Sequence, residues 1–251
     1  MDIAVITGAS SGLGKEYLVK ILKMFPELDK IWIIARRKER LEELAGLSPK
    51  IVPYPFDLTS PDFVSGFSDL LKAEKPNIKL LINNAGYGKL GLFEDISLED
   101  NTGIVRLNCE AFTAVAYLAL RYMSEGGQII NICSIASFAP NTRMTVYSST
   151  KAYVMSFSRA LRSELKPRKI NVLSVCPGPM DTEFLPVASI EKGTSGTFDT
   201  LPRVDPAEIA EKSLIASKKG RAVYTNKAFY KFYRFVAKIL PASLVMKFSG
   251  T

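Results

Sequence analysis

Short apolar runs alternate with longer segments of mixed polarity along most of the chain. The short runs are rich in Ile, Val and Leu, which is typical of buried strands, and they predict strands at residues 3–7, 31–35, 51–54, 80–83, 128–133, 170–176 and 221–224. Between them the apolar positions follow helical spacing and predict helices at residues 13–25, 40–47, 63–73, 101–122, 145–165 and 207–217. Strands this apolar, with helices between them, indicate a parallel sheet covered on both faces, the doubly wound α/β architecture.

Residues 110–120, EAFTAVAYLAL, are apolar or small almost all round the predicted helix. A helix without a polar face is buried on two sides. One side can cover the sheet, and the other is either central in the fold or covered by a second copy of the chain. We favour the second arrangement and predict a homo-oligomer, either a dimer or a tetramer.

Composition narrows the class of protein. The 251 residues are 47% hydrophobic and 23% charged, without an internal repeat or linker, so we expect one domain over residues 1–251. Cys109, Cys133 and Cys176 are widely spaced and there is no histidine, which predicts a reducing, cytoplasmic compartment and no metal site.

The net charge of +8 comes from dispersed bases, which disfavours a nucleic-acid partner. No apolar run reaches the length of a membrane span, and strand-like residues open the chain, so we expect a soluble protein.

A glycine-rich loop, TGASSGLG at residues 7–14, follows the first predicted strand and opens directly into a helix. Glycines let the chain turn tightly and let the backbone approach a pyrophosphate, and the helix N-terminus behind them favours negative charge. Glycine also serves ordinary turns between strands and helices. The strand before the loop and the helix after it favour a dinucleotide site.

The second predicted strand ends in Ala35, Arg36 and Arg37. An NAD-binding unit usually offers an acid here to the ribose 2′-hydroxyl, whereas an arginine accommodates the 2′-phosphate of NADP. Arg36 can stack on adenine or bind the phosphate with its guanidinium fork, and Arg37 can assist. The alternative is that both arginines belong to a solvated helix start. We favour NADP over NAD.

Tyr147 and Lys151 lie one turn apart on the same face of a predicted helix, in a chain without histidine. Such a pair is either an ordinary surface contact or an acid–base system. A free tyrosine has a pKa of about 10, which is too high for proton transfer near neutrality. A nearby cation favours the phenolate, so we expect Lys151 and an oxidised nicotinamide to lower the pKa of Tyr147.

Taken together, these motifs resemble a known family. TGASSGLG at 7–14, NNAG at 83–86, Ser134, YSSTK at 147–151 and PGPMDT at 177–182 resemble the short-chain dehydrogenase/reductases in order and spacing, over residues 1 to about 225. The resemblance implies a single Rossmann-type domain with a seven-stranded parallel sheet and oxidoreductase activity.

The resemblance also implies roles for single residues. The catalytic tetrad of the family falls on Asn108, Ser134, Tyr147 and Lys151, with Asn108 holding a water that links Lys151 to solvent. Asp57 is expected beside the adenine, and Thr182 at the nicotinamide carboxamide. The full set of expected cofactor contacts is Gly8, Ser10, Ser11, Gly12, Leu13, Gly14, Arg36, Arg37, Asp57, Leu58, Asn84, Ala85, Gly86, Tyr147, Lys151, Pro177, Gly178 and Thr182.

Residues 183–204 mix Gly, Ser, Thr and Pro with apolar residues and precede a capped helix start at Asp205-Pro206. They predict a mobile substrate lid in which Phe184, Leu185, Val187 and Ile190 could contact an apolar substrate. A plain surface loop is the alternative.

The C-terminal tail, residues 226–248, is rich in aromatic and basic residues. On a helix its bases share one face, and Pro241 should break or kink the helix. We favour packing of the tail over the substrate pocket or a second subunit. Peripheral contact with an anionic membrane is the alternative.

The sequence therefore predicts an oxidoreductase that transfers a hydride between NADP(H) and a carbonyl or alcohol of a small or medium apolar molecule, such as a steroid-like or acyl substrate. The main alternative is a non-catalytic dinucleotide-binding sensor or scaffold. The intact tetrad argues against that alternative, because a pure binder has no need of both Tyr147 and Lys151.

Overall fold

The computed structural model describes residues 1–249 and contains one parallel sheet of seven strands. The strands are β1 (Asp2–Thr7), β2 (Lys30–Ile34), β3 (Ile51–Tyr54), β4 (Asn77–Asn83), β5 (Gln128–Ile132), β6 (Asn171–Val175) and β7 (Val223–Tyr224). Their order across the sheet is β3-β2-β1-β4-β5-β6-β7, and every pair is parallel. The predicted seven-stranded doubly wound fold is confirmed.

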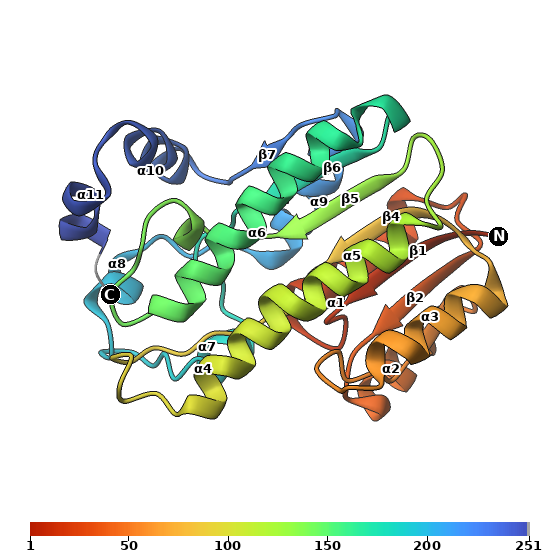
Figure 1. Cartoon of the computed structure of the whole chain (residues 1–251), viewed down its shortest axis with the longest axis horizontal. Helices are drawn as coiled ribbons and strands as arrows, with labels where there is room; N and C mark the ends of the chain where they lie inside the picture. Colours follow the sequence, from red (N-terminus) through yellow and green to blue (C-terminus); the bar gives the residue numbers. More distant parts are fainter. Residues whose placement is uncertain (250–251) are drawn as a thin grey trace.

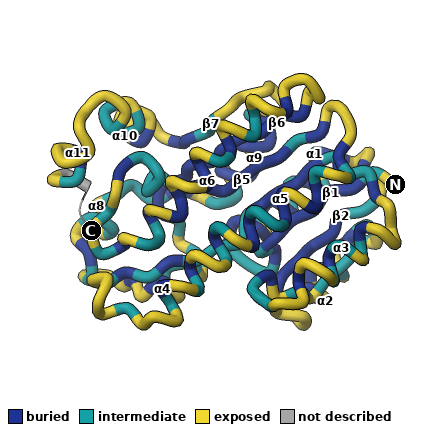
Figure 2. Tube along the Cα trace, in the orientation of Figure 1, coloured by how far each residue is buried: buried dark blue, intermediate teal, exposed yellow. Residues whose placement is uncertain are grey.

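Side chains alternate between the two faces of the sheet, as the pleat requires. In β1, Ala4 and Ile6 join one apolar cluster, and Ile3 and Val5 join the other. The first face is covered by α1 (Gly12–Met24), α2 (Lys38–Ala45) and α9 (Pro206–Lys218), and the second by α3 (Phe63–Glu74), α5 (Phe112–Leu120) and α6 (Thr145–Glu164). The strands are accordingly the most buried part of the trace (Figure 2).

The predicted helix at 101–122 is a continuous helical stretch with a wider turn in its middle. It consists of α4 (Leu98–Val105), a π-helical segment (Arg106–Ala111) and α5. The stretch Leu98–Leu120, whose most apolar window has a mean hydropathy of 1.3, is long and apolar enough to cross a membrane by length and composition, which corrects the expectation from sequence. Part of it is buried, 44% of its most apolar window, and α5 packs on β4 as the core helix of a folded domain does.

The outer side of α5 is exposed in the single chain. Tyr117 is 58% exposed, and Arg121 stacks on its ring with the guanidinium carbon 4.5 Å from the ring centroid. The rest of α5 is buried or half-buried against the sheet, so only this part of the helix surface is open in the single chain. A second copy of the chain stays a prediction for this surface.

The remaining elements gather at the carboxyl edge of the sheet. These are α7 (Phe184–Val187), α8 (Gly196–Thr200), α10 (Ala228–Ile239) and α11 (Ala242–Ser249). Figure 1 shows them at the end of the molecule to which the strand arrows point, away from the N-terminus. The break between α10 and α11 falls at Pro241, as predicted, because proline cannot donate the hydrogen bond that would continue the helix.

The edge strand β7 is shorter than predicted, and the start of α9 lies where it was predicted. β7 is limited to two residues of the predicted 221–224, because this edge strand pairs only with Ser174 and Val175. The predicted start of α9 is confirmed: the Asp205 side chain accepts a hydrogen bond from the Ala207 backbone N–H at 3.0 Å.

Candidate active site

The glycine loop between β1 and α1 is shaped by two positions where only glycine fits. Gly8 has a φ of +67°, and a Cβ there would lie 2.9 Å from the Cα of Ala85. A Cβ on Gly14 would lie 2.2 Å from the Gly8 carbonyl oxygen, so the first turn of α1 packs directly on the loop. This close backbone packing leaves a cradle at a helix N-terminus, which fits the pyrophosphate of a dinucleotide.

The turn after β4 holds this loop in place. The Thr7 hydroxyl accepts hydrogen bonds from the backbone N–H groups of Asn84 and Ala85, at 3.0 and 3.1 Å. The Asn84 side-chain amide donates to the carbonyl oxygens of Thr7 and Gly8, at 3.0 and 3.2 Å. Asn84 thus lines the cleft and also fixes the glycine loop, whereas the structural role of Thr7 was missed from sequence.

The predicted catalytic pair lies on one face of α6. Lys151 is 5% exposed, and its ammonium lies 5.7 Å from the centroid of the Tyr147 ring. Lys151 donates to the Ile132 carbonyl oxygen at the end of β5, at 2.9 Å, and the Ser134 side chain hydrogen-bonds Tyr147. Tyr147, Lys151 and Ser134 therefore meet at the carboxyl edge of the sheet, where doubly wound folds bind ligands.

Burial controls the protonation of this pair. It raises the pKa of Tyr147 to about 12, and the hydrogen bond from Ser134 offsets only part of that rise. Burial also lowers the pKa of Lys151. In the ligand-free chain burial therefore sets the pKa of Tyr147. The expectation that Lys151 and an oxidised nicotinamide together lower this pKa stays a prediction for the enzyme with its cofactor bound.

Asn108 lies in the π-helical segment and points its amide at the backbone after β4. Its Nδ2 donates to the Tyr87 carbonyl at 2.9 Å and to the Thr150 hydroxyl at 3.0 Å, and its Oδ1 accepts from the Tyr87 N–H at 3.1 Å. A Cβ on Gly86 would lie 2.9 Å from this Oδ1 and 3.4 Å from the Lys151 ammonium. Asn108 therefore clamps the Gly86–Tyr87 turn beside Lys151, and Tyr87 and Thr150 are site residues that sequence reasoning missed.

One cleft of about 940 Å³ brings the predicted residues together. Every residue predicted for catalysis or cofactor binding except Gly14 and Asn108 lines it, and these two lie behind the glycine loop and the Gly86–Tyr87 turn. Asp57 turns its Oδ1 toward the Thr59 N–H and hydroxyl, at 2.9 and 2.7 Å, so this carboxylate shapes the turn after β3. A volume of this size accommodates a dinucleotide or a drug-sized ligand.

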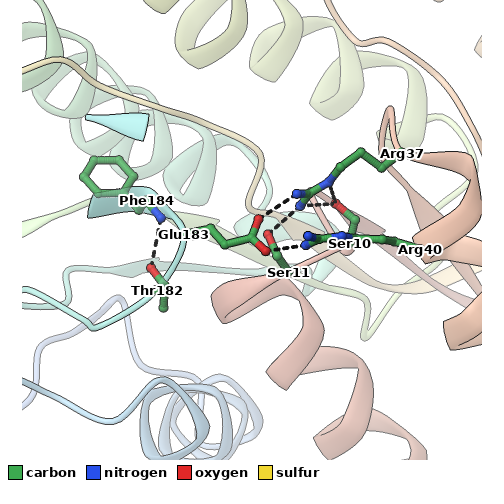
Figure 3. Close-up of polar contacts among 7 residues, drawn as sticks. All are labelled: Ser10, Ser11, Arg37, Arg40, Thr182, Glu183 and Phe184. Carbon is green, nitrogen blue, oxygen red and sulfur yellow. Dashed lines mark hydrogen bonds and ion pairs between the residues drawn. The ribbon is translucent and has the colours of Figure 1, made fainter. Parts of the chain in front are cut away.

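Basic and hydroxyl side chains meet beside the glycine loop, and we call Ser10, Ser11, Arg37 and Arg40 the anion site (Figure 3). Ser10, Ser11 and Arg37 line the cleft, and Arg40 lies behind them. Arg37 donates from Nη2 to the hydroxyls of Ser10 and Ser11, at 3.0 and 2.9 Å. The Glu183 carboxylate completes the cluster, bound to both arginines. The donor set fits a phosphate, because guanidinium forks and hydroxyls are the groups that bind one. Arg40 and Glu183 were not predicted for this site, although Arg40 follows Arg37 at helical spacing.

The predicted lid and tail form the apolar wall of the cleft. Phe184, Leu185 and Val187 line it, and the Phe184 ring lies 5.4 Å from that of Tyr147. Ile190 does not line it. It is 5% exposed in a cluster with Leu90 and Ala188, so the prediction that it contacts substrate is wrong.

Tyr230 of α10 fixes the tail to the cleft. Its buried ring lies against Gly178, where a Cβ would be 2.3 Å from the ring, and its hydroxyl donates to the Pro202 carbonyl at 2.7 Å. Phe229 and Tyr233 line the cleft beside it. The favoured prediction that the tail packs over the pocket is confirmed for this face of α10.

A family model described as short chain dehydrogenase matches residues 2–192. The chain belongs to this family. A solved short-chain dehydrogenase from Sphingobium yanoikuyae, in complex with NADPH, is 28% identical with a TM-score of 0.78, and the match covers 96% of this chain and 97% of that one.

Two curated relatives extend the comparison. The NADP-dependent 3-hydroxy acid dehydrogenase of Schizosaccharomyces pombe is 32% identical to this short-chain dehydrogenase over 223 residues, 84% of this chain and 85% of the relative. The probable oxidoreductase EphD of Mycobacterium tuberculosis is 28% identical over 264 residues, 95% of this chain and 43% of EphD. This short-chain dehydrogenase thus spans less than half the length of EphD.

Proposed function

We propose that the chain is an NADP-dependent oxidoreductase that interconverts a carbonyl and an alcohol on a small to medium apolar substrate. The observation that carries the proposal is the meeting of Tyr147, Ser134 and buried Lys151 in a cleft with a dinucleotide-type glycine loop. The apolar wall formed by Phe184 and the tail favours a steroid-like or acyl substrate.

The proposed chemistry assigns one task to each side chain. A nicotinamide dinucleotide, when bound, supplies or accepts the hydride. During reduction Tyr147 gives its proton to the carbonyl oxygen, and during oxidation the phenolate takes the proton of the alcohol. The Ser134 hydroxyl hydrogen-bonds the same oxygen and holds it in position. Lys151 keeps a positive charge close to the phenol.

NADP rather than NAD is favoured by the anion site. No acid stands at the end of β2, where Ala35, Arg36 and Arg37 follow one another. The relative from Schizosaccharomyces pombe is named NADP-dependent, and the Sphingobium structure contains NADPH. These observations agree with Arg36 and Arg37, which both line the cleft and can bind a 2′-phosphate there.

The decisive test of this function is a spectrophotometric screen. NADPH and NADH are each offered with ketones, aldehydes, ketosteroids and acyl thioesters, and consumption of the reduced nicotinamide is followed. We expect turnover with at least one of these classes and a higher kcat/KM with NADPH than with NADH. Binding of NADPH without turnover on any class would favour the sensor or scaffold.

We also propose that the outer face of α10 contacts an anionic membrane. Phe232, Phe235 and Ile239 are 61–65% exposed on this helix, and exposed Lys231 and Lys238 lie beside them. Tyr230 secures the opposite face to the cleft, so these side chains are left facing outward. An amphipathic helix with aromatics on one side and bases next to them matches an anionic bilayer surface.

Co-sedimentation with vesicles tests the membrane contact. The full chain should sediment with vesicles that contain phosphatidylserine but not with pure phosphatidylcholine, and high salt should weaken the binding. Phe232→Ser combined with Phe235→Ser should abolish it. If the unmodified chain stays in solution with both vesicle types, the proposal fails and the cytoplasmic location predicted from sequence is favoured.

A further inference from the structure

The carboxylate of Glu183 lies where two arginines converge (Figure 3). Its Oε2 accepts from Nη1 of Arg37 at 2.7 Å, and its Oε1 accepts from Nη1 of Arg40. Glu183 follows Thr182 directly and begins the lid segment, whereas the arginines come from the end of β2 and from α2. One acidic side chain therefore links the lid to the nucleotide end of the cleft.

The cluster carries more positive than negative charge. Hydrogen bonds from Arg40 and Arg37 lower the pKa of Glu183 to about 2, so the carboxylate is ionised throughout the working range. One carboxylate charge faces two guanidinium charges, and Arg36 lines the same cleft. An anion with two charges would balance the anion site better than Glu183 does.

A cofactor phosphate and Glu183 cannot both occupy this position. A phosphate monoester carries about −1.5 to −2 charges at neutral pH and accepts several hydrogen bonds, so it repels a carboxylate held by the same donors. NADP has such a group on its adenosine ribose, and NAD has only a hydroxyl there. NADP binding must therefore release Glu183, whereas NAD binding leaves both ion pairs in place.

We infer that Glu183 is a specificity-determining residue, whose carboxylate competes with the 2′-phosphate of NADP(H) for Arg37 and Arg40. The inference rests on the proposed use of NADP. In the ligand-free chain the Glu183 carboxylate takes the place of the phosphate. This competition reduces the preference for NADP over NAD. Glu183 is the first residue of the lid. Binding of the 2′-phosphate therefore also releases the start of the lid from Arg37 and Arg40.

The effect should be moderate, because the ion pairs are partly exposed. The side chains of Arg37, Arg40 and Glu183 are 42–44% exposed, and exposed ion pairs contribute little individually. We therefore expect Glu183→Gln to raise the affinity for ligands that bear a 2′-phosphate by about three- to tenfold. Glutamine keeps the size of the side chain and removes its charge.

Calorimetric binding tests this inference without reference to turnover. The unmodified chain, Glu183→Gln and Glu191→Gln are each titrated with NADPH, NADH, adenosine 2′,5′-bisphosphate and adenosine 5′-monophosphate. Glu191 is an exposed glutamate of the same lid segment, so its substitution removes the same net charge. Circular dichroism checks that both variants are folded.

The inference predicts a selective change. Glu183→Gln should bind NADPH and the bisphosphate more tightly by the stated factor and leave NADH and the monophosphate unchanged, and Glu191→Gln should change none of the four affinities. An equal change for NADPH and NADH, or no change in either, would overturn the inference. The unmodified chain tests the proposed function separately: tighter binding of NADH than of NADPH would refute NADP preference whatever the variants do.

Discussion

The phenol of Tyr147 is held by Ser134 beside the cleft, and burial decides its protonation. Its raised pKa keeps the phenol protonated in the ligand-free chain at any physiological pH. A protonated phenol is ready to donate during carbonyl reduction. For alcohol oxidation it must first lose its proton, and there the pyridinium charge of an oxidised cofactor would assist.

This difference predicts a different pH dependence for each direction of the reaction. We expect kcat/KM for alcohol oxidation to rise steadily from about pH 6 to about pH 9, because the phenolate fraction grows while pH stays below the raised pKa of Tyr147. Carbonyl reduction needs the neutral phenol and should show no such rise. The measurement is kcat/KM against pH in both directions with saturating cofactor. An oxidation profile that is already flat at neutral pH would contradict it.

Tyr230 is the buried residue of α10 and joins the tail to the rest of the chain. Its side chain is fully buried, and its hydroxyl bonds the Pro202 carbonyl, so it links α10 to the segment before α9. By contrast, the other large apolar side chains of α10 that point outward do not contribute to this joint. One face of α10 is thus packed against the rest of the chain, and the other face is exposed.

Substitutions on the two faces of α10 should have different effects on the free energy of unfolding. Tyr230→Ala should lower the free energy of unfolding by about 3 kcal/mol through the cavity that it leaves, and Tyr230→Phe by about 1 kcal/mol through the lost hydrogen bond. Phe232→Ala, at a side chain 65% exposed, should stay within about 0.5 kcal/mol. Denaturant unfolding measures all three. Equal stability of Tyr230→Ala and Phe232→Ala would show that the contacts of Tyr230 do not contribute to the stability of the fold.

Sequence reasoning located helices and strands well where the pattern is local. The periodicity of residues 145–165 and the cap at Asp205 predicted α6 and α9 to within a few residues. It missed Glu183 and Tyr230, because their partners Arg37, Arg40 and Pro202 are distant in sequence and no local pattern connects them. It also misjudged Ile190, because an apolar residue in a loop can face a pocket or the core, and only packing decides.

At the scale of the whole molecule, the alternation of apolar runs was enough to predict the sheet. All-parallel strands are buried on both faces and read as continuous apolar runs, so both architecture and strand number followed from the sequence. The protonation states of Tyr147 and Lys151 could not be predicted from the sequence. The sequence shows that a lysine stands near a tyrosine, but the burial that raises the pKa of Tyr147 and lowers that of Lys151 depends on the complete fold.

The exposed side of α5 leads to a prediction about assembly. We propose that two copies pair through this side and the neighbouring part of α6, where Tyr117 and Tyr153 are 58% and 41% exposed. Tyr117→Arg should then shift the mass measured by light scattering toward that of a monomer, because the substitution places a charge in an apolar interface. Leu47→Arg, at an equally exposed residue after α2, should leave the mass unchanged. A monomeric unmodified chain would contradict the predicted oligomer.

The central claim is that Tyr147 transfers the proton in a cleft built to bind NADP. The most direct test compares Tyr147→Phe with the unmodified chain, measuring NADPH binding by titration and carbonyl reduction by NADPH consumption. Phenylalanine keeps the ring that packs against Phe184 and removes only the hydroxyl. We predict an unchanged Kd for NADPH and a loss of kcat of at least about a hundredfold. Comparable turnover in the two proteins would contradict the claim.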